Sequence, residues 1–477
     1  MKKLKTIDEI NEKIRNGKAV VFTAEEFKEL AKTASPSELV KSVDVVTTAT
    51  FGPMCSSGAF INVGHTKPGT RMEKMSLNGV PSYGGIAAVD TYLGATEVSP
   101  DDPEYGGAHV IEAFVRGDEI RLQAEGKGTD CYPNRTVDTV IDKTTVNEAY
   151  LFNPRNAYQN YRAAVNGSEG VIRTYMGILQ PRFGNMTFAT TGEWSPLLND
   201  PYLRFFGLGT KVWFCGTDGF VAWHGTQFND QRPRNERGIP TMPAATLALI
   251  GDMKTMDPDY IRAAYFSRYG VTLNLGIGAA LPVLDEDAAF DLTVRNVDIQ
   301  TKICDYGDPS NPLIGETNYE ELFSGSVLFD GKTIRTSPTS SLYKARSIMT
   351  ILKERIENGT FFLTQAAAPI GHGNGVRGLD IRFPKNTVVA NETFTESNAV
   401  RYYSSRCVSC GYCTGLCPSE ALSIVLGKKL VFEPEKCIGC GLCAEACPTK
   451  SFYAIGGEHV SGTKISSIHE PIPFYGI

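Results

Sequence analysis

A cysteine motif that occurs twice near the C-terminal end constrains this chain more than any other feature. Residues Cys407–Pro418 follow the pattern C-x2-C-x2-C-x3-C-P, and Cys437–Pro448 repeat it thirty residues later. Eight of the twelve cysteines lie in these two segments, and four are spread over the first 406 residues. The C-terminal segment is therefore an internal duplication with a chemistry of its own.

The spacing of these cysteines indicates iron–sulfur clusters. Three closely spaced cysteines can bind three irons of a cubane, while the fourth, next to a proline, reaches the neighbouring cluster. Structural zinc more often uses paired C-x2-C motifs with a long spacer, and disulfides do not suit this tight spacing. The segment resembles bacterial two-cluster ferredoxins over about residues 400–458. We predict two [4Fe–4S] clusters, the first bound by Cys407, Cys410, Cys413 and Cys447, and the second by Cys437, Cys440, Cys443 and Cys417.

Length and charge limit the function of the remaining residues. A chain of 477 residues can form one large domain and a small one, and its 42% hydrophobic residues suffice for a sizeable core. The net charge of −6 offers no basic surface for nucleic acid or for an anionic membrane. The N-terminus is charged and has no apolar signal-peptide core, and no stretch of 18 apolar residues occurs. We expect a cytoplasmic protein.

Local patterns predict a mixed α and β (α+β) architecture. Thr6 and Thr23 begin capping-box helices, and strands are expected near residues 20–22 and 43–48. Glycine-punctuated, β-rich sequence follows as far as residue 219, including a hairpin turn at Asp218-Gly219. Two further helices are predicted at 257–270 and 342–359. The expected domains are a catalytic domain at 1–385, a linker at 386–404, a small ferredoxin-like two-cluster domain at 405–458 and a tail at 459–477.

Two of the four remaining cysteines occupy glycine-framed loops. Cys55 follows a predicted strand in Phe51–Gly58, and Cys131 lies in Gly126–Arg135. Loop N–H groups can favour a thiolate at such positions, although a single reduced cysteine is commonly a small buried hydrophobe. Cys215 and Cys304 lack this frame, and packing roles are expected for them. The histidines form no metal-binding pair, and the G-x-G-x-x-G match at 373–378 precedes an expected strand instead of the helix that a dinucleotide site needs.

The order of several blocks resembles the homocysteine biosynthesis family. These blocks are FGPMCSSGAF, SLNGVPSYGGIAAVDTYLGAT, GKGTDCYPNRT and GLGTKVWFCGTDGFVAWHGTQF. The resemblance covers roughly residues 1–385 and implies an L-aspartate semialdehyde sulfurtransferase of the kind found in methanogens and other strict anaerobes. It also implies sulfur handling by Cys55 and Cys131, with Cys131 as the persulfide carrier. Archaeal relatives carry CBS modules and use a separate ferredoxin-containing partner, whereas here a two-cluster segment follows directly.

The implied reaction is reductive sulfur transfer from sulfide, or another sulfur donor, to aspartate semialdehyde, with two electrons supplied through the clusters by a low-potential donor. A ferredoxin-dependent disulfide or flavin reductase and a non-catalytic electron-transfer subunit are the alternatives. No nucleic acid or membrane partner is expected, and a homo-oligomer is left open. Candidate substrate-binding residues are Arg71, Asp90 and Arg135. Candidate proton donors are Tyr83, Tyr92 and Tyr132.

Overall fold

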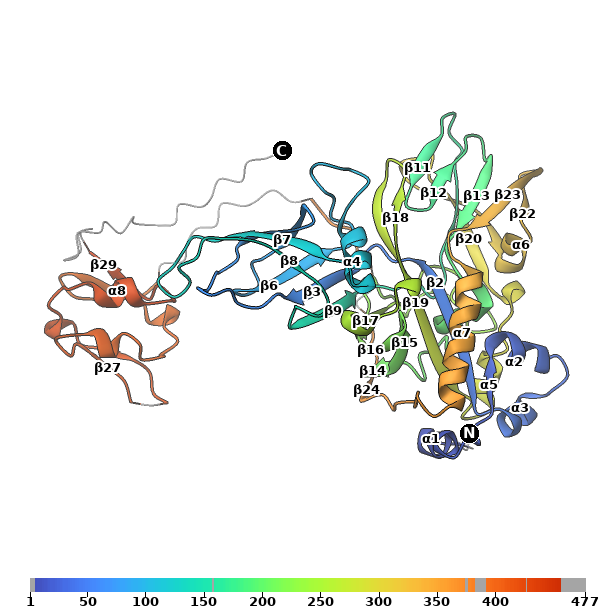
Figure 1. Ribbon diagram of the computed structural model, residues 1–477, viewed down its shortest axis with the longest axis horizontal. Coiled ribbons are helices and arrows are strands. Elements are labelled where there is room, and N and C mark those ends of the chain that lie inside the picture. Colours follow the sequence, from blue (N-terminus) through green and yellow to red (C-terminus); the bar gives the residue numbers. More distant parts are fainter. Residues whose placement is uncertain (1–4, 157, 374–375, 382–391, 426, 456–477) are drawn as a thin grey trace. The chain divides into compact units, whose positions relative to one another are not determined.

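Short helices form the N-terminal part of the computed structural model (Figure 1), and two of them start with the expected capping boxes. The Thr6 hydroxyl accepts a hydrogen bond from the Glu9 amide, and the Thr23 hydroxyl does the same for Glu26, so each threonine satisfies an otherwise unpaired amide of its helix. Both predicted helix starts are confirmed. The helices of the N-terminal part are α1 (Ile7–Arg15), α2 (Ala24–Leu30) and α3 (Pro36–Ser42).

The structure describes residues 5–156, 158–373, 376–381, 392–425 and 427–455. The chain divides into two compact units, Met1–Gly378 and Leu379–Ile477. Part of the predicted linker, at 386–391, and the predicted tail at 459–477 lie outside the described residues. Strands and helices alternate and pack together in the first unit, which confirms the expected mixed α and β architecture.

The first unit is built around a long, mostly antiparallel sheet. Its strands β1 and β2 are parallel and confirm the two strands expected near the N-terminus. In spatial order the strands are β1 (Val21–Thr23), β2 (Val45–Pro53), β19 (Gly270–Pro282), β15 (Lys211–Phe214), β16 (Thr217–His224), β17 (Leu247–Asp252), β9 (Glu148–Asn153), β3 (Gly58–Asn62), β6 (Asp90–Gly94), β5 (Val80–Tyr83), β4 (Lys74–Leu77), β7 (Ile120–Glu125) and β8 (Thr136–Ile141), with β18 (Ile261–Phe266) paired to β19.

A second sheet of six strands has its own apolar core within the same unit. In spatial order its strands are β21 (Leu313–Asn318), β20 (Gln300–Asp305), β10 (Ala163–Val165), β13 (Asn185–Phe188), β23 (Lys332–Pro338) and β22 (Ser326–Phe329). Shorter pairs are β11 (Ile172–Thr174) with β12 (Gly177–Leu179), and β14 (Gly207–Leu208) with β24 (Ala368–Pro369).

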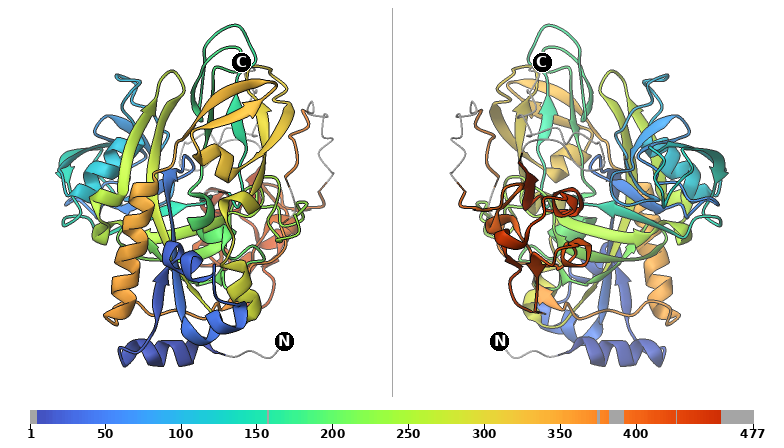
Figure 2. Two further views of the ribbon diagram at one scale, coloured as in Figure 1. Left: turned by 90° about the vertical axis from the view of Figure 1, so that its right-hand side faces the viewer. Right: turned by 90° about the vertical axis from the view of Figure 1, so that its left-hand side faces the viewer.

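Helices cover the long sheet. The predicted C-terminal helix is confirmed as α7 (Leu342–Glu357), which packs along β2 and β19 (Figure 2). Its apolar residues Ala345, Ile348, Leu352 and Ile356 are buried, as the helical spacing predicts. Helix α4 (Gly107–Arg116) packs against β18 and β19. The remaining helices of this unit are α5 (Glu286–Asp291) and α6 (Tyr319–Phe323).

Two local predictions are wrong. The helix expected at 257–270 is a single 3-10 turn, Pro258–Tyr260, followed by β18, because this segment gains a full ladder of hydrogen bonds from the long strand β19. The hairpin turn lies at Cys215 and Gly216, with φ of 48° and 95°, and not at Asp218-Gly219. Positive φ at both central residues gives the twist that a two-residue hairpin needs. Asp218 instead pairs with Trp213 inside the hairpin.

The second unit is small and rich in loops. Its apolar residues Val400, Tyr402, Leu422, Leu430 and Phe452 pack together with cysteines of both motifs. Its elements are β25 (Thr395–Glu396), β26 (Val400–Tyr402), β27 (Leu422–Ser423), β28 (Val431–Phe432), α8 (Leu442–Ala446) and β29 (Phe452–Ala454). Strand β26 pairs with both β25 and β29, so it ties the start of this unit to its end.

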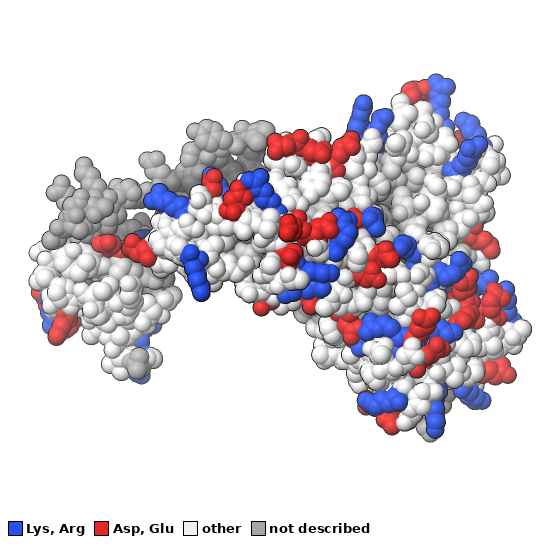
Figure 3. All heavy atoms as spheres, viewed as in Figure 1, with Lys and Arg blue, Asp and Glu red and all other residues white. Residues whose placement is uncertain are grey.

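Surface charge and helix length bear on the expected partners. On the face drawn in Figure 3, acidic and basic side chains of the first unit are intermixed, and the described residues there form no continuous basic stripe. Within the described part of the chain, no helix is both long and apolar enough to span a bilayer.

Candidate functional site

Cys55 lies at the point where the long strand β2 gives way to β3. Strand β2 is buried along almost its whole length, so the loop that follows it starts from a fixed position. The Cys55 thiol is half-buried, and the Thr272 hydroxyl donates a hydrogen bond to its sulfur at 3.1 Å. Thr272 belongs to β19, the neighbour of β2 in the sheet. Two adjacent strands therefore orient the thiol.

A cavity of about 110 Å³ opens at this thiol. Its walls are formed by the end of β2 and the Cys55 loop, by the segment after β9, by the turn between β11 and β12, and by the residues that follow β13 and β23 of the second sheet. Among the described residues that line it, none is a histidine, an aspartate or a glutamate. The lining residues are Thr50, Gly52, Pro53, Met54, Cys55, Ser56, Arg155, Asn156, Tyr158, Tyr161, Tyr175, Met176, Ala189 and Ser340.

Three tyrosines, Tyr158, Tyr161 and Tyr175, line this cavity. The hydroxyl of Tyr161 hydrogen-bonds that of Tyr175 at 2.7 Å, and Tyr175 in turn bonds Tyr306 at 2.5 Å. Burial raises the pKa of Tyr306 to about 12, and it raises the pKa values of Tyr161 and Tyr175 further. Tyr158 stacks on Tyr161 with ring centroids 5.0 Å apart. The chain of three hydroxyls is therefore fully protonated at neutral pH and connects the cavity to the second sheet.

The thiols of Cys215 and Cys304 are buried, and each has a hydrogen-bond partner. Cys215 occupies the hairpin turn, and burial raises the pKa of its thiol to about 12. The Cys304 thiol is also buried and donates to the Asn311 carbonyl at 3.2 Å, while Arg162 approaches its sulfur at 3.7 Å. Neither thiol lines the cavity at Cys55.

Cys131 lies in the loop between β7 and β8 and is exposed. Its sulfur is 3.5 Å from the Thr129 hydroxyl, and its neighbour Tyr132 stacks on His65. Strand β7 is four positions from β3 in the sheet, which corresponds to roughly 19 Å at the usual strand spacing. The structure therefore does not bring Cys131 to the Cys55 cavity, and a joint role of the two thiols stays a prediction.

The other candidates named from the sequence also lie away from this cavity. The Arg71 side chain is 59% exposed and has Glu73 at 4.0 Å, while Asp90 accepts a hydrogen bond from Asn62 on the neighbouring strand. Arg135 packs close to Gly128 in the Cys131 loop. Tyr83 is exposed, Tyr132 belongs to the Cys131 loop, and Tyr92 lies over Gly58 next to the Cys55 loop. Their roles in catalysis or binding stay predictions.

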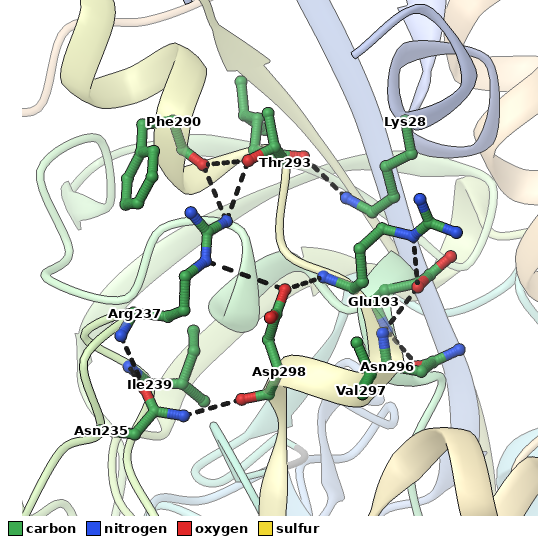
Figure 4. Close-up of polar contacts among 12 residues, drawn as sticks. Lys28, Glu193, Asn235, Arg237, Ile239, Phe290, Thr293, Asn296, Val297 and Asp298 are labelled. Carbon is green, nitrogen blue, oxygen red and sulfur yellow. Dashed lines mark hydrogen bonds and ion pairs between the residues drawn. The ribbon is translucent and has the colours of Figure 1, made fainter. Parts of the chain in front are cut away.

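A second concentration of charge surrounds the buried Lys28 (Figure 4). Its ammonium group donates to the Leu292 carbonyl at 2.7 Å and to the Asn199 side chain at 2.9 Å. Burial lowers the pKa of Lys28 to about 7. Nearby, Glu193 accepts from the Asn296 amide, and Arg237 lies 3.8 Å from Asp298. These bonds join α2 to the segment that leads into the second sheet, so we interpret the cluster as a structural connection.

In the second unit, the first three cysteines of one motif and the last of the other lie around one cavity. Cys407, Cys410, Cys413 and Cys447 all line it. Amides of Ser409 and Ser451 donate to the sulfurs of Cys407 and Cys447, each at 3.3 Å. Amide donors to thiolate sulfur are typical of iron–sulfur sites. The donor set therefore fits the first cluster with the crossed ligand set that the spacing predicts.

Three cysteines of the second set, Cys437, Cys440 and Cys443, lie close to one another. Burial raises the pKa of Cys443 to about 12, and the nearby Cys437 and Cys440 contribute to the increase. Iron offsets this cost because it binds the thiolate, which couples metal binding to loss of the proton. In the described residues no three His, Cys, Asp or Glu side chains converge on a single-ion site. The four cysteines of a cubane each bind a different iron, so their sulfurs lie further apart than the ligands of a single metal ion.

Comparisons with known proteins assign the family. Residues 19–363 match the model of a family described as homocysteine biosynthesis enzyme, sulfur-incorporation. The chain belongs to this family. Residues 399–448 match a 4Fe-4S dicluster domain, so the chain also carries iron–sulfur ligands in its second unit. The alternative of a non-catalytic electron-transfer subunit is therefore wrong, because the first unit is that of an enzyme.

Two curated relatives carry a specific name. The L-aspartate semialdehyde sulfurtransferase of Methanosarcina acetivorans is 43% identical over 378 residues, which cover 79% of this chain and 74% of the relative. The enzyme of the same name from Methanocaldococcus jannaschii is 45% identical over 386 residues, covering 77% and 74%. An uncharacterised protein of Methanothermobacter thermautotrophicus is 30% identical over 67% of this chain and 72% of its own length. No solved structure matches.

Sequence reasoning found Cys55 in this homocysteine biosynthesis enzyme but missed the residues around it. Arg155, Tyr158 and Tyr161 follow β9 in the run Pro-Arg-Asn-Ala-Tyr-Gln-Asn-Tyr, where aromatic and polar residues alternate without an apolar face. Such a run is too polar for a core strand, and this was the one local signal that could have marked it. Tyr175 and Ser340 carry no local signal, because only the folded chain brings them to Cys55.

Proposed function

We propose that this enzyme converts L-aspartate semialdehyde and sulfide to L-homocysteine. The reaction replaces the aldehyde oxygen with sulfur and reduces the carbon: one aldehyde, one hydrogen sulfide, two electrons and two protons give one thiol and one water. Membership of the family and the name shared by its two curated relatives support the substrate. The observation that carries the proposal is a half-buried thiol, Cys55, at the wall of a small cavity that three tyrosines also line.

The first step assigned to Cys55 is addition of its sulfur to the aldehyde carbon. The Cys55 sulfur, oriented by Thr272, forms the new C–S bond, and the carbonyl oxygen becomes an alkoxide that takes a proton. Tyr158, Tyr161 and Tyr175 line the cavity and are the nearest proton donors. A proton that Tyr161 donates can be replaced along the hydrogen-bonded hydroxyls that lead to Tyr306.

Sulfide then completes the exchange. Loss of the protonated oxygen as water allows sulfide to add to the same carbon, which is then bonded to the Cys55 sulfur and to the new sulfur. Two electrons and one proton break the bond to Cys55, and a second proton restores its thiol, so homocysteine leaves. When bound in the second unit, the two [4Fe–4S] clusters would supply electrons one at a time. The predicted ligands are Cys407, Cys410, Cys413 and Cys447 for one cluster, and Cys437, Cys440, Cys443 and Cys417 for the other.

Cys131 has a different setting. Its thiol is exposed at a loop tip, which suits exchange with a sulfur donor or reductant from solvent better than contact with a substrate in a cavity. We propose it as the carrier of a persulfide, whose outer sulfur it takes from a persulfide donor by exchange and releases as sulfide on reduction with two further electrons and two protons. Arg71, Asp90 and Arg135 remain predicted contacts for an incoming amino acid and are assigned no step.

The test is an anaerobic assay of the reconstituted protein with aspartate semialdehyde, sulfide and a low-potential reductant, with homocysteine measured by mass spectrometry. We expect homocysteine to form in an amount equal to the aldehyde consumed. Cys55→Ser should abolish turnover at unchanged iron content, and Cys131→Ser should retain turnover with free sulfide while losing it with a persulfide donor. Absence of homocysteine from protein with both clusters intact would refute the proposed function.

A further inference from the structure

Arg155 is the one cationic residue among those that line the Cys55 cavity in the described part of the chain. It follows β9 directly, and its carbonyl accepts a hydrogen bond from the Ser56 hydroxyl at 3.2 Å. This bond ties the arginine backbone to the loop that carries Cys55. The guanidinium carbon lies 5.9 Å from the centre of the Tyr158 ring, on the cavity wall. Arg155 and Cys55 therefore belong to the same rigid surroundings.

The guanidinium of Arg155 has no anionic partner in the described structure. No described Asp or Glu lies within 4.0 Å of it, and no acidic residue is among those described around the cavity. Among the other partly buried arginines, Arg237 faces the carboxylate of Asp298, whereas Arg234 donates to two backbone carbonyls, those of Pro201 and Gly238. The Arg155 side chain interacts with the Tyr158 hydroxyl, but a half-buried charge without a partner of opposite sign is unfavourable unless a ligand neutralises it. The missing counter-ion in this cavity is the observation that points to an anionic ligand.

We propose that Arg155 binds the carboxylate of the substrate in the Cys55 cavity and so restricts the enzyme to carboxylate-bearing aldehydes. This rests on the proposed function and adds the substrate class to it. The planar guanidinium matches a carboxylate through two parallel hydrogen bonds. With one end of a four-carbon molecule fixed at Arg155, the aldehyde at the other end meets the thiol in the same cavity. An aldehyde without a carboxylate cannot form these hydrogen bonds, so Arg155 does not strengthen its binding.

The kinetic test compares two substrates in two variants of Arg155. Arg155→Met should raise KM for L-aspartate semialdehyde on the order of 10- to 100-fold, the usual value of a charge-assisted contact. KM for 3-aminopropanal, which keeps the amine and lacks the carboxylate, should be the same in the wild type and the variant. Arg155→Lys keeps the charge but lacks the planar guanidinium, so its KM for L-aspartate semialdehyde should lie between those of the wild type and Arg155→Met. Arg121→Met, an exposed arginine on β7, is the control and should leave both values unchanged. An equal loss with both substrates, or no loss with either, would overturn the inference.

A binding test separates this inference from the proposed function. Alkylation of Cys55 by iodoacetamide is followed by mass spectrometry with L-homoserine, 3-amino-1-propanol or inorganic phosphate present. We expect L-homoserine alone to protect Cys55, and to protect it in the wild type but not in Arg155→Met. Protection that depends on Arg155 in an enzyme that makes no homocysteine would support the inference and reject the function. Protection of the variant by L-homoserine, or protection of the wild type by phosphate at equal concentration, would reject the inference whatever the turnover.

Discussion

Replacing the buried Lys28 by methionine should change how stability depends on pH. Burial lowers the pKa of Lys28 to about 7 from 10.5, so between these values the folded protein holds the amine neutral while the unfolded chain is protonated. Unfolding in this window takes up a proton, and the free energy of unfolding therefore rises with pH. Below about pH 7 Lys28 is protonated in both the folded and the unfolded state, so the free energy of unfolding no longer changes with pH through this group. The full shift corresponds to about 5 kcal/mol at 1.36 kcal/mol per pH unit.

The measurement is denaturant unfolding from pH 6.5 to 9.5, followed by tryptophan fluorescence. All three tryptophans, Trp194, Trp213 and Trp223, lie in the first unit, so the signal reports that unit alone. At pH 9 the Lys28→Met protein should be the less stable one, because the Asn199 oxygen and the Leu292 carbonyl lose their donor.

The difference between wild type and Lys28→Met should shrink steadily toward pH 7. Lys32→Met removes an exposed lysine near α2 and should keep the slope of the wild type. Parallel curves for Lys28→Met and wild type over the whole range would refute the reasoning, because Lys28 would then have the same affinity for protons in both states.

Three further outcomes are expected. Cys447→Ser should remove about half of the iron from the reconstituted protein, and Cys417→Ser the other half, as measured by iron analysis; full iron in both would contradict the crossed ligand sets. Cys55→Ser should lower turnover by at least about 1000-fold at full iron content, whereas residual activity near the wild-type level would remove the thiol from the reaction. Gly107→Ala should destabilise the first unit by about 1–3 kcal/mol, because an added Cβ would lie 1.9 Å from the Gly94 carbonyl oxygen, whereas Gly94→Ala meets open space and should be neutral in the same fluorescence assay.

Local patterns predict those parts of the fold that local interactions determine. The capping boxes at Thr6 and Thr23 and the apolar spacing of α7 each depend on contacts within one turn or one helix face, and all three predictions are confirmed. The helix expected at 257–270 is wrong because pairing with a distant strand overrides its local signals. The position of the hairpin turn depends on which residues accept positive φ, and two neighbouring dipeptides could do so.

Local sequence also predicts only part of the candidate site. Glycine-framed loops mark both Cys55 and Cys131, yet one thiol faces a cavity and the other faces solvent. The difference arises from what packs over each loop, and at Cys55 this includes Tyr175, in the turn between β11 and β12, and Ser340, which follows β23 of the second sheet. Long-range pairing of this kind leaves no trace in local sequence. The absence of a carboxylate beside Arg155 is likewise a property of the folded cavity, and local sequence does not predict it.

The composition of the cavity also bears on how protons are supplied. Reduction of an aldehyde to a thiol consumes two protons in each turnover, yet the described lining contains no histidine and no carboxyl group. His109 accepts a hydrogen bond from the Gly106 amide and stacks on Tyr105, and it does not line this cavity. In the proposed reaction the phenols are the assigned proton donors, and burial keeps the pKa of Tyr306, at about 12, far above neutral pH.

A donor of this kind is protonated throughout the physiological range, so it does not compete with Cys55 for a proton as a histidine would. Such a site suits a reaction in which the nucleophile has to be a sulfur anion while the leaving oxygen needs an acid. A phenol in a hydrogen-bonded chain stays protonated over this range and can pass a proton to the alkoxide. The absence of histidine among the described lining residues is therefore consistent with acid catalysis by Tyr161 and its chain.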